Sequence, residues 1–266
     1  MTPNEVSFLR RLVAGRPTDR RHDGVAARMS EVEGLGTVRG ARIVYAAHDY
    51  DRAARILLSR GFELQAPAEA FARSQAPRGG SEKTGARRVT HGLVAVVPVG
   101  MGDALAAAPG SFLAMQWTAA LALPYEALLV SENLEPLMLL ERYRWLESFF
   151  KRRPILAVFR GAPGMFGNEA ATKLIAQDNR PTLAFFDFDP KGLSMAASLP
   201  RREALCLPPW HDLEAATRAA RRDHLFSNSA HQCRAHLDHV SDSQIAVAWQ
   251  RLKALAVGLD QEGFPK

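Results

Sequence analysis

The chain has few cysteines, few lysines and no long apolar run. Its 266 residues include only two cysteines, Cys206 and Cys233, which excludes the disulfide framework of a small secreted domain. No uncharged apolar stretch reaches the roughly 18 residues of a membrane-spanning helix. The first residues, MTPNEVSFLRRL, lack the cationic-then-apolar order of a signal peptide. We therefore expect a cytoplasmic protein with no membrane partner.

Positive charge is concentrated at one end of the chain. Residues 1–90 contain 16 Lys and Arg against 10 Asp and Glu, whereas residues 91–266 contain 18 of each. Most of the cations are Arg, which forms forked hydrogen bonds to phosphate, so the basic region indicates a nucleic-acid partner. A GC-rich genome that favours Arg codons accounts for the Arg bias equally well, but less well for its uneven placement.

The basic region, residues 1–90, has the pattern of a small α+β module. Thr2-Pro3-Asn4-Glu5 is a capping box that predicts a helix to about residue 15. Helices at about 20–32 and 50–60 and a strand at 41–45 complete a winged-helix-like arrangement. The Gly- and Arg-rich segment 73–91 ends the region, either as a phosphate-contacting arm that includes Arg87 and Arg88 or as a solvated linker.

Apolar strands alternate with helices over residues 91–210. A strand at 93–97 and a helix at 112–121 lead into this region. The strands that follow are predicted at 127–131, 155–159, 182–186 and 203–207, and the helices at 133–148, 166–177 and 190–198. This alternation predicts an α/β domain with a parallel sheet covered by helices. Residues 211–266 are predicted to form a C-terminal helical tail, with a last helix at 242–257.

Charged residues stand where three of these strands end. Glu132, Arg160 and Asp187 each follow an apolar run, and Asp189 comes two residues later. Ligands of parallel sheets bind at the carboxyl ends of the strands. Clustered carboxylates can hold Mg²⁺ or Mn²⁺, which stabilise both oxygens of a phosphoryl transfer. Asp-Phe-Asp-Pro-Lys-Gly is also good turn and helix-capping chemistry, but the upstream Glu132 favours the metal site.

This set of residues resembles the Toprim domain, which topoisomerases, primases and several nucleases share. Toprim proteins carry a Glu after the first strand and a D-x-D after a later one, as in Glu132 of LLVSENLE and Asp187 and Asp189 of FFDFDPKG. RGAPG, Arg160–Gly164, resembles the RGHPG-type turn of relatives of the topoisomerase VI A subunit. That branch includes the Toprim nuclease subunit of the Wadjet anti-plasmid systems, which works with an SMC-type complex. The resemblance covers roughly residues 125–210.

The resemblance implies a metal-dependent DNA endonuclease that is the effector of an SMC-type plasmid-defence complex. Glu132, Asp187 and Asp189 would hold Mg²⁺ or Mn²⁺, with Glu132 alternatively a general acid or base. Arg160 would steady the scissile phosphate or form a surface ion pair, and Lys191 would contact nucleic acid or be solvated. Because one site per chain must cut two strands, we expect a homodimer.

Two other functions remain open at this stage. The chain could be a non-catalytic DNA-binding or scaffolding subunit that keeps a Toprim fold. A primase-like polymerase is the third option, although the chain is short of the extra elements a polymerase needs. The substrate could be DNA or RNA.

Several further side chains are candidates for the site or for a second one. Glu135 and Asn133 follow Glu132 closely enough to reach it, while Gly161 and Gly164 are read as turn residues. The C-terminal region forms either an amphipathic surface or a zinc site, although the spacing matches no common finger. This region also contains His211 and His224, and the residues with zinc-like types are His231, Cys233, His236 and His239. A catalytic His is the remaining alternative.

The tyrosines argue against covalent catalysis. The topoisomerase branch cleaves DNA with a Tyr in an N-terminal helix-turn-helix domain, and none of the four tyrosines here lies in such a setting. Tyr45 follows an apolar strand and is predicted to lie in the core, whereas Tyr50 opens a helix and could be exposed. Hydrolysis by a metal-activated water therefore fits better than a tyrosyl intermediate.

Overall fold

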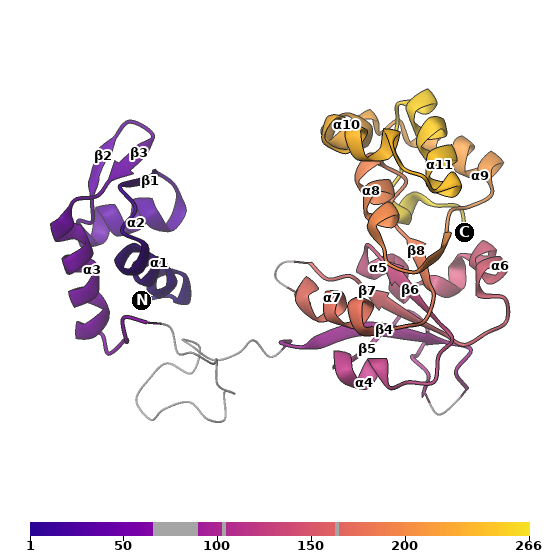
Figure 1. Cartoon of the computed structure of the whole chain (residues 1–266), viewed down its shortest axis with the longest axis horizontal. Helices are drawn as coiled ribbons and strands as arrows, with labels where there is room; N and C mark the ends of the chain where they lie inside the picture. Colours follow the sequence, from indigo (N-terminus) through magenta and orange to yellow (C-terminus); the bar gives the residue numbers. More distant parts are fainter. Residues whose placement is uncertain (66–89, 103–104, 163–164) are drawn as a thin grey trace. The chain divides into compact units, whose positions relative to one another are not determined.

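The chain folds into two compact units, Met1–Val89 and Thr90–Lys266 (Figure 1). The computed structural model describes residues 1–65, 90–102, 105–162 and 165–266. The predicted phosphate contacts Arg87 and Arg88 lie outside these described residues. Within the described part, no helix has both the length and the apolar character needed to cross a membrane.

The first unit is built around a three-stranded antiparallel sheet with the strand order β1-β3-β2. A two-residue turn at Gly40 and Ala41 joins β2 to β3. Arg39 at the end of β2 pairs with Arg42 at the start of β3. In the structure a single helix separates β1 from β2. The winged-helix-like arrangement stays a prediction. The elements described here are α1 (Pro3–Gly15), β1 (Asp19–Arg21), α2 (Gly24–Glu33), β2 (Thr37–Arg39), β3 (Arg42–Val44) and α3 (Ala47–Ser59).

Helix α1 begins as the capping box predicts. The Thr2 hydroxyl accepts from the Glu5 backbone N–H at 3.3 Å, and the Glu5 carboxylate accepts from the Thr2 N–H at 2.6 Å. These two bonds satisfy two of the backbone donors that every helix start leaves unpaired. The apolar face of α1 then forms the core of this unit, with Val6, Leu9 and Leu12 buried.

Two predictions for the first unit are wrong. The helix expected from residue 20 begins at Gly24, because Asp19–Arg21 pairs with β3 as a strand. Tyr50 is 8% exposed rather than solvent-facing, because its hydroxyl donates to the Pro17 carbonyl at 3.1 Å and draws the ring inward. Tyr45 is buried, as predicted.

The second unit is a mixed α/β body around a six-stranded sheet with the strand order β5-β4-β7-β6-β8-β9. Strands β7, β6, β8 and β9 run parallel, which confirms this part of the predicted sheet. Strand β4 runs antiparallel to both of its neighbours, so the complete sheet is mixed. The strands are β4 (Leu93–Val99), β5 (Leu113–Gln116), β6 (Ala127–Ser131), β7 (Ile155–Phe159), β8 (Thr182–Phe185) and β9 (Arg202–Leu205).

Helices flank this sheet, and two of them differ from prediction. The helix expected at 112–121 is a strand over its first half, because Leu113–Gln116 pairs with β4. The single helix expected at 133–148 is broken into short pieces around Tyr143. The helices are α4 (Trp117–Leu121), α5 (Leu134–Met138), η3 (Leu140–Arg142), η4 (Arg144–Leu146), α6 (Glu147–Phe150), α7 (Asn168–Gln177), α8 (Pro190–Ser198), α9 (Trp210–Ala220), α10 (Asp223–Asp238), α11 (Ser243–Leu255) and η5 (Gln261–Gly263).

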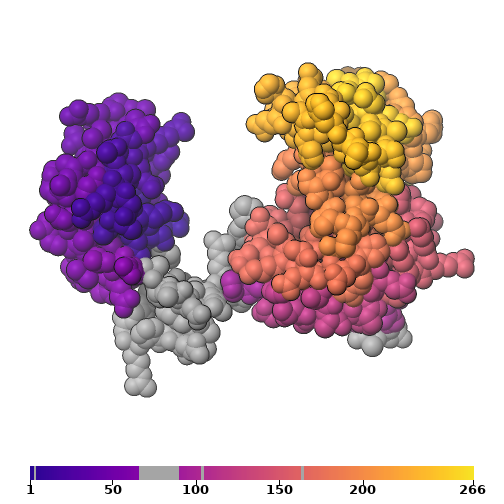
Figure 2. All heavy atoms as spheres, viewed as in Figure 1, coloured from indigo at the N-terminus to yellow at the C-terminus, as the bar shows by residue number. Residues whose placement is uncertain are grey.

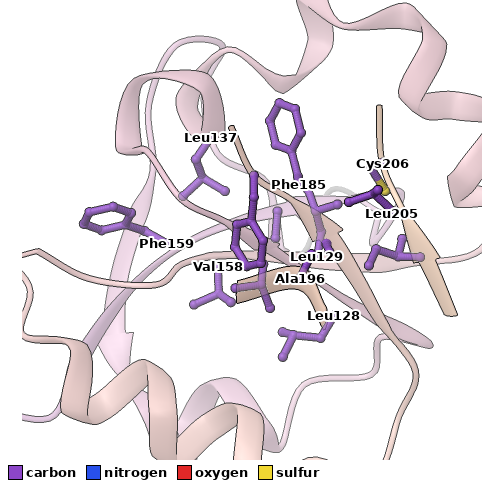
Figure 3. Close-up of a cluster of buried hydrophobic side chains, with 14 of the residues drawn as sticks. Leu128, Leu129, Leu137, Val158, Phe159, Phe185, Ala196, Leu205 and Cys206 are labelled. Atoms are coloured by element: carbon purple, nitrogen blue, oxygen red, sulfur yellow. The ribbon is translucent and has the colours of Figure 1, made fainter. Parts of the chain in front are cut away.

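The core of the second unit lies on the parallel strands. Leu128, Leu129, Val158 and Phe185 are at most 1% exposed, and Figure 3 shows them among the side chains that join neighbouring strands. Strands buried on both faces are expected to be continuously apolar, as these are. This core fixes the strand ends that carry the charged residues.

Residues 211–266 belong to the second unit and are not a separate tail. Helices α10 and α11 pack against α8, and Ile245, Trp249 and Leu252 of α11 enter the same core as the strands. In the space-filling view these C-terminal helices continue the surface of the rest of the unit (Figure 2). The predicted boundary at 210 therefore does not separate two bodies.

Candidate functional site

Three neighbouring strands bring three of the predicted site residues to one edge of the sheet. Ser131 of β6 pairs with Phe185 of β8, so Glu132 and Asp187 leave the sheet side by side. The Glu132 N–H donates to the Phe185 carbonyl at 3.1 Å, and the Arg160 N–H donates to the Ser131 carbonyl at 3.0 Å. The backbone ladder itself therefore places Arg160 on the other side of Glu132.

Glu132 is the centre of this arrangement. Its side chain is 7% exposed and lies 3.4 Å from Nη2 of Arg160 and 3.8 Å from Nζ of Lys191. Its other oxygen, Oε2, accepts from the Asp187 N–H at 3.4 Å. One carboxylate thus links the ends of β6, β7 and β8. The ion pair predicted as the alternative role of Arg160 is present, with Glu132 as its partner.

Asp189 has the capping role that the turn interpretation predicts. Its Oδ1 accepts from the Gly192 N–H at 2.6 Å, and Pro190 opens helix α8. A Cβ on Gly192 would lie 2.2 Å from the Asp187 carbonyl oxygen, so only glycine allows α8 to start this close to the strand end. The cap and the tight start together hold Asp187 and Asp189 against the sheet edge, with Asp189 9% exposed.

The surroundings of the three carboxyl groups disfavour their ionised forms. Burial raises the pKa of Asp187 to about 8, and the negative charges of Glu132 and Asp189 add to the rise. Burial also raises the pKa of Glu132 against the opposing charge of Arg160, and it raises the pKa of Asp189 against the hydrogen bond from Gly192. A bound cation would oppose this effect by stabilising the ionised forms.

The donor chemistry of the site suits a hard divalent cation, which prefers carboxylate oxygens. The side chains are not, however, assembled as ligands. In the described part of the chain, no three or more His, Cys, Asp or Glu side chains form a group ready to hold a metal. Glu132 is engaged by Arg160 and Lys191, and one oxygen of Asp189 by the helix cap. Binding an ion would require Glu132 to exchange its cationic partners for the metal.

A C-terminal strap, residues 258–264, crosses the same edge of the sheet. Phe188 and Leu259 form a two-way backbone bridge, at 2.7 and 2.9 Å, which joins the strap to the segment between the two aspartates. The Gln261 N–H then donates to Oδ1 of Asp187 at 2.8 Å. The strap therefore holds the Asp187 carboxylate through a backbone hydrogen bond.

Gln261 connects the strap to the strand ends. Its side chain is fully buried; Nε2 donates to the Phe185 carbonyl at 2.9 Å and contacts the Ser131 hydroxyl at 3.2 Å. Its Oε1 accepts from the Asn133 N–H at 2.8 Å, and Tyr143 donates to its backbone carbonyl at 3.1 Å. Both polar atoms of this side chain therefore hold together the edge of the sheet that carries Glu132, Asp187 and Asp189, which we call the acidic edge.

Asn133 adds another acid to the neighbourhood. Its amide Nδ2 donates to Asp187 at 3.1 Å and to Glu262 at 3.3 Å, so it bridges the two carboxylates. Burial, together with the charges of Asp260 and Glu135, raises the pKa of Glu262.

Sequence reasoning missed Gln261 and Glu262. The only signal in the sequence is the polar run Asp260-Gln261-Glu262, which follows no strand and matches no motif.

The remaining predicted residues are less central. Glu135 is exposed, and its charge acts on Glu262 and Tyr143 rather than on Asp187. Gly161 is a turn residue, as predicted, with φ +96°, and a Cβ there would lie 2.6 Å from the Cα of Asn168. Gly164 lies outside the described residues.

The histidines do not form a zinc site in the described structure. All five are exposed in the C-terminal region, and among the described residues no three of them form a group that could hold a metal ion. They are His211, His224, His231, His236 and His239. His236 shares a hydrogen bond of 2.9 Å with Ser194, which attaches α10 to α8. Their arrangement matches the amphipathic interpretation.

All four tyrosines of the chain are buried. Tyr45, Tyr50, Tyr125 and Tyr143 are between 2% and 8% exposed, and the hydroxyls of the last three donate to main-chain carbonyls or to a carboxylate. The structure thus offers no exposed tyrosine nucleophile.

The family described as a domain of unknown function (DUF7281) matches residues 88–264, and the chain belongs to that family. The match begins within two residues of the second unit and includes Glu132, Asp187, Asp189 and Gln261. Residues 1–87 of the first unit lie outside it. No curated protein and no solved structure matches the chain.

Proposed function

We propose that this member of the DUF7281 family is a metal-dependent DNA endonuclease with a Toprim-like site. The observation that carries the proposal is the convergence of Glu132 and Asp187 from adjacent parallel strands, with Oε2 of Glu132 3.4 Å from the Asp187 N–H. Asp189 joins them from the start of α8. Acids from separate strands are gathered at the sheet edge where α/β folds bind ligands.

Glu132, Asp187 and Asp189 would hold Mg²⁺ or Mn²⁺. A divalent ion there would supply charge stabilisation for the attacking and leaving oxygens of a phosphodiester. Arg160 is 31% exposed and already lies at the site, so it can turn from Glu132 to a phosphate oxygen once Glu132 binds the ion. Lys191, with a side chain 59% exposed, offers a second cation at the rim.

Water is the proposed nucleophile. The burial of every tyrosine supports hydrolysis over a covalent tyrosyl intermediate. Burial raises the pKa of Glu132, which favours its alternative role as a general acid or base.

The proposed setting follows the resemblance of residues 125–210 to the Toprim subunit of plasmid-defence complexes. The chain would act in the cytoplasm as the effector of an SMC-type complex. It would work as a homodimer, because two copies of the site are needed to cut two strands.

A non-catalytic DNA-binding or scaffolding subunit is the second candidate. The ion pairs of Glu132 with Arg160 and Lys191, and the capping bond of Asp189, favour it because they stabilise the acids without a metal. In that case the acidic edge would serve only to hold the strand ends and the strap in place.

The deciding experiment is cleavage of supercoiled plasmid by the full chain in Mg²⁺ or Mn²⁺. We expect nicking or linearisation that EDTA abolishes and that falls at least about 100-fold in Glu132→Gln and Asp187→Asn. Glu169→Gln is the matched control, because Glu169 is an exposed acid paired with Lys173 at 2.8 Å on α7. It should cleave at the wild-type rate.

Binding of Mn²⁺, measured by calorimetry, separates the two candidates if the wild type is inactive. Mn²⁺ binding that is lost in Asp187→Asn supports an enzyme that needs its partner complex. Absence of both cleavage and Mn²⁺ binding contradicts the nuclease and leaves the scaffolding subunit.

A further inference from the structure

The first unit contains a basic cleft that the catalytic site does not use. Its volume is about 280 Å³, and it is open to solvent. Three arginines from α1 and β1 face it, Arg11, Arg20 and Arg21, and we call it the arginine cleft. Its lining consists of these three residues with Phe8, Asp23, Val25 and Ala26.

The arginines of this cleft are poorly neutralised, whereas three other arginines of the same unit form ion pairs with carboxylates. Arg28 pairs with Glu5 at 3.2 Å, Arg60 pairs with Glu33 at 2.6 Å, and Arg42 pairs with Asp19. Among the residues that the structure describes, no carboxylate lies within 4.0 Å of the guanidinium of Arg11 or Arg20.

Arg21 has only a weak partner. Its Nε lies 3.9 Å from Asp23, and the two side chains are 84% and 68% exposed. Exposed pairs of this kind contribute little. Counting Asp23 against Arg11, Arg20 and Arg21, the cleft keeps an excess of two positive charges.

Arg20 is held in place without being neutralised. Its Cζ lies 5.7 Å from the ring centroid of Phe8, which is itself 3% exposed. Its backbone is fixed by the pairing of Arg20 with Ile43 in the sheet. A cation anchored by a ring and a strand has little conformational entropy left to lose when it binds an anion.

The charge balance of the chain identifies the kind of anion. Residues 1–65 carry 11 Arg against 8 acids, an excess of three, whereas residues 91–266 carry 18 of each sign. Arginine side chains match phosphate oxygens with forked hydrogen bonds. An open, basic cleft with several such forks suits an extended polyanion better than a small enclosed ligand.

We propose, building on the nuclease function above, that the arginine cleft binds the phosphodiester backbone of the DNA substrate. Binding there is independent of sequence, because phosphates carry no base information. The first unit thus supplies affinity, and the acidic edge of the second unit supplies chemistry.

The test is the affinity of the full chain for a fluorescein-labelled DNA duplex, measured by anisotropy in EDTA so that no cleavage occurs. The triple variant Arg11→Gln/Arg20→Gln/Arg21→Gln is compared with a matched triple that loses the same charge elsewhere on the unit. That control is Arg39→Gln/Arg52→Gln/Arg55→Gln, because all three are exposed and none lines the cleft.

We expect the cleft variant to bind at least about 10-fold more weakly. The slope of log K against log salt should fall by about 2 to 3, corresponding to three lost phosphate contacts at roughly 0.9 each. The control triple should lose less than about 3-fold. Arg20→Lys, which keeps the charge but not the fork, should lie between the wild type and the cleft variant. Thermal unfolding of each variant checks that the first unit remains folded.

Three results would overturn the proposal: no DNA binding by the wild type, equal losses in the two triples, or competition by polyglutamate as effective as that by unlabelled DNA. The nuclease proposal is judged separately, since Glu132→Gln/Asp187→Asn should bind the duplex at least as tightly as the wild type. Selective loss of DNA binding in the cleft variant, with neither plasmid cleavage nor Mn²⁺ binding by the wild type, would retain the cleft and reject the nuclease. Plasmid cleavage together with DNA binding that does not depend on the cleft would retain the nuclease and reject the cleft.

Discussion

Several buried carboxylates of this protein are paired with hydrogen-bond donors or with arginines. Asp178 is the clearest case outside the acidic edge, at 1% exposed. It accepts from the Tyr125 hydroxyl at 2.6 Å and from Nε of Arg180 at 2.7 Å, and the guanidinium lies 3.4 Å from the centroid of the tyrosine ring. Arg180 also donates to main-chain carbonyls around α4, so this group connects the end of α7 to the start of β6.

Asp178→Asn should destabilise the protein in a pH-dependent way. Burial alone would raise the pKa of Asp178, but the hydrogen bonds from Tyr125 and Arg180 and the Arg180 charge outweigh burial and lower it. A lowered pKa in the folded state gives stability that is present above about pH 4 and lost as the pH falls further. We expect the variant to lose about 2 to 3 kcal/mol at pH 7, and this deficit to shrink towards pH 3.

Urea unfolding of wild type and variant at pH 7, 5 and 3 measures this deficit. Glu126→Gln is the control, because Glu126 is a nearby acid that is exposed. It should change stability by less than about 0.5 kcal/mol at every pH. A deficit in Asp178→Asn that is the same at all three pH values would rule out the charge as its cause.

Single residues differ in how far the sequence reveals them. Glu132 and Asp187 could be predicted because each directly ends an apolar run, and the ends of parallel strands meet at one edge. Gln261 could not, because its role depends on contacts with residues 76 and 130 positions away. The burial of Tyr50 is hidden from the sequence for the same reason, since its hydrogen-bond partner, Pro17, lies 33 positions away.

Among the elements, the C-terminal strap determines how firmly the acidic edge is held. Gln261→Ala would leave the Phe185 carbonyl, the Asn133 N–H and the Ser131 hydroxyl without their partner in a buried place. We expect Mn²⁺ affinity to fall about 10- to 100-fold, as for residues that orient metal ligands, because the Gln261 side chain no longer anchors the strap whose backbone N–H holds Asp187. Calorimetric titration with Mn²⁺ measures the loss.

Gln244→Ala provides the matched comparison for the strap. Gln244 also caps a backbone donor at the edge of this sheet, accepting from the Leu205 N–H at 2.8 Å, but it does not touch the acids. Its removal should lower the melting temperature and leave Mn²⁺ affinity unchanged. Equal losses of affinity in both variants would mean that Gln261 contributes only general stability.

Elements defined by local pattern could be predicted, and those defined by distant contacts could not. Strands β6 and β7 lie at the expected residues, because a short and continuously apolar run is typical of a parallel strand that is buried on both faces. The helix expected over 133–148 is interrupted at Tyr143, whose ring packs on Phe185 and whose hydroxyl reaches Gln261. The first half of the segment 112–121 similarly becomes a strand because β4 is available to pair with it.

For the molecule as a whole, the important feature is the presence of two separate hydrophobic cores. One contains Leu9 of α1 and the other Leu129 of β6, and both residues are fully buried. We predict two thermal transitions by calorimetry. Leu9→Ala should lower only one of them, by the equivalent of about 2 to 5 kcal/mol, and Leu129→Ala only the other.

The same two variants identify the unit that binds Mn²⁺. Mn²⁺ should raise the transition that Leu129→Ala lowers and leave unchanged the one that Leu9→Ala lowers, because the acids all lie in the second unit. A single transition shifted by either variant would show that the two units unfold together.

The strap also has a consequence during protein synthesis. Asp187 and its partner Gln261 are 74 residues apart, which at roughly 5–20 residues per second corresponds to roughly 4–15 s of translation. During that interval the nascent chain already holds both aspartates and the arginines of the first unit, but the acids are not yet fixed. If the proposed functions hold, a chain that ends before the strap would bind DNA through its first unit but would cut it poorly. Synthesis of the strap would then be the last step before the acidic site is fixed in place.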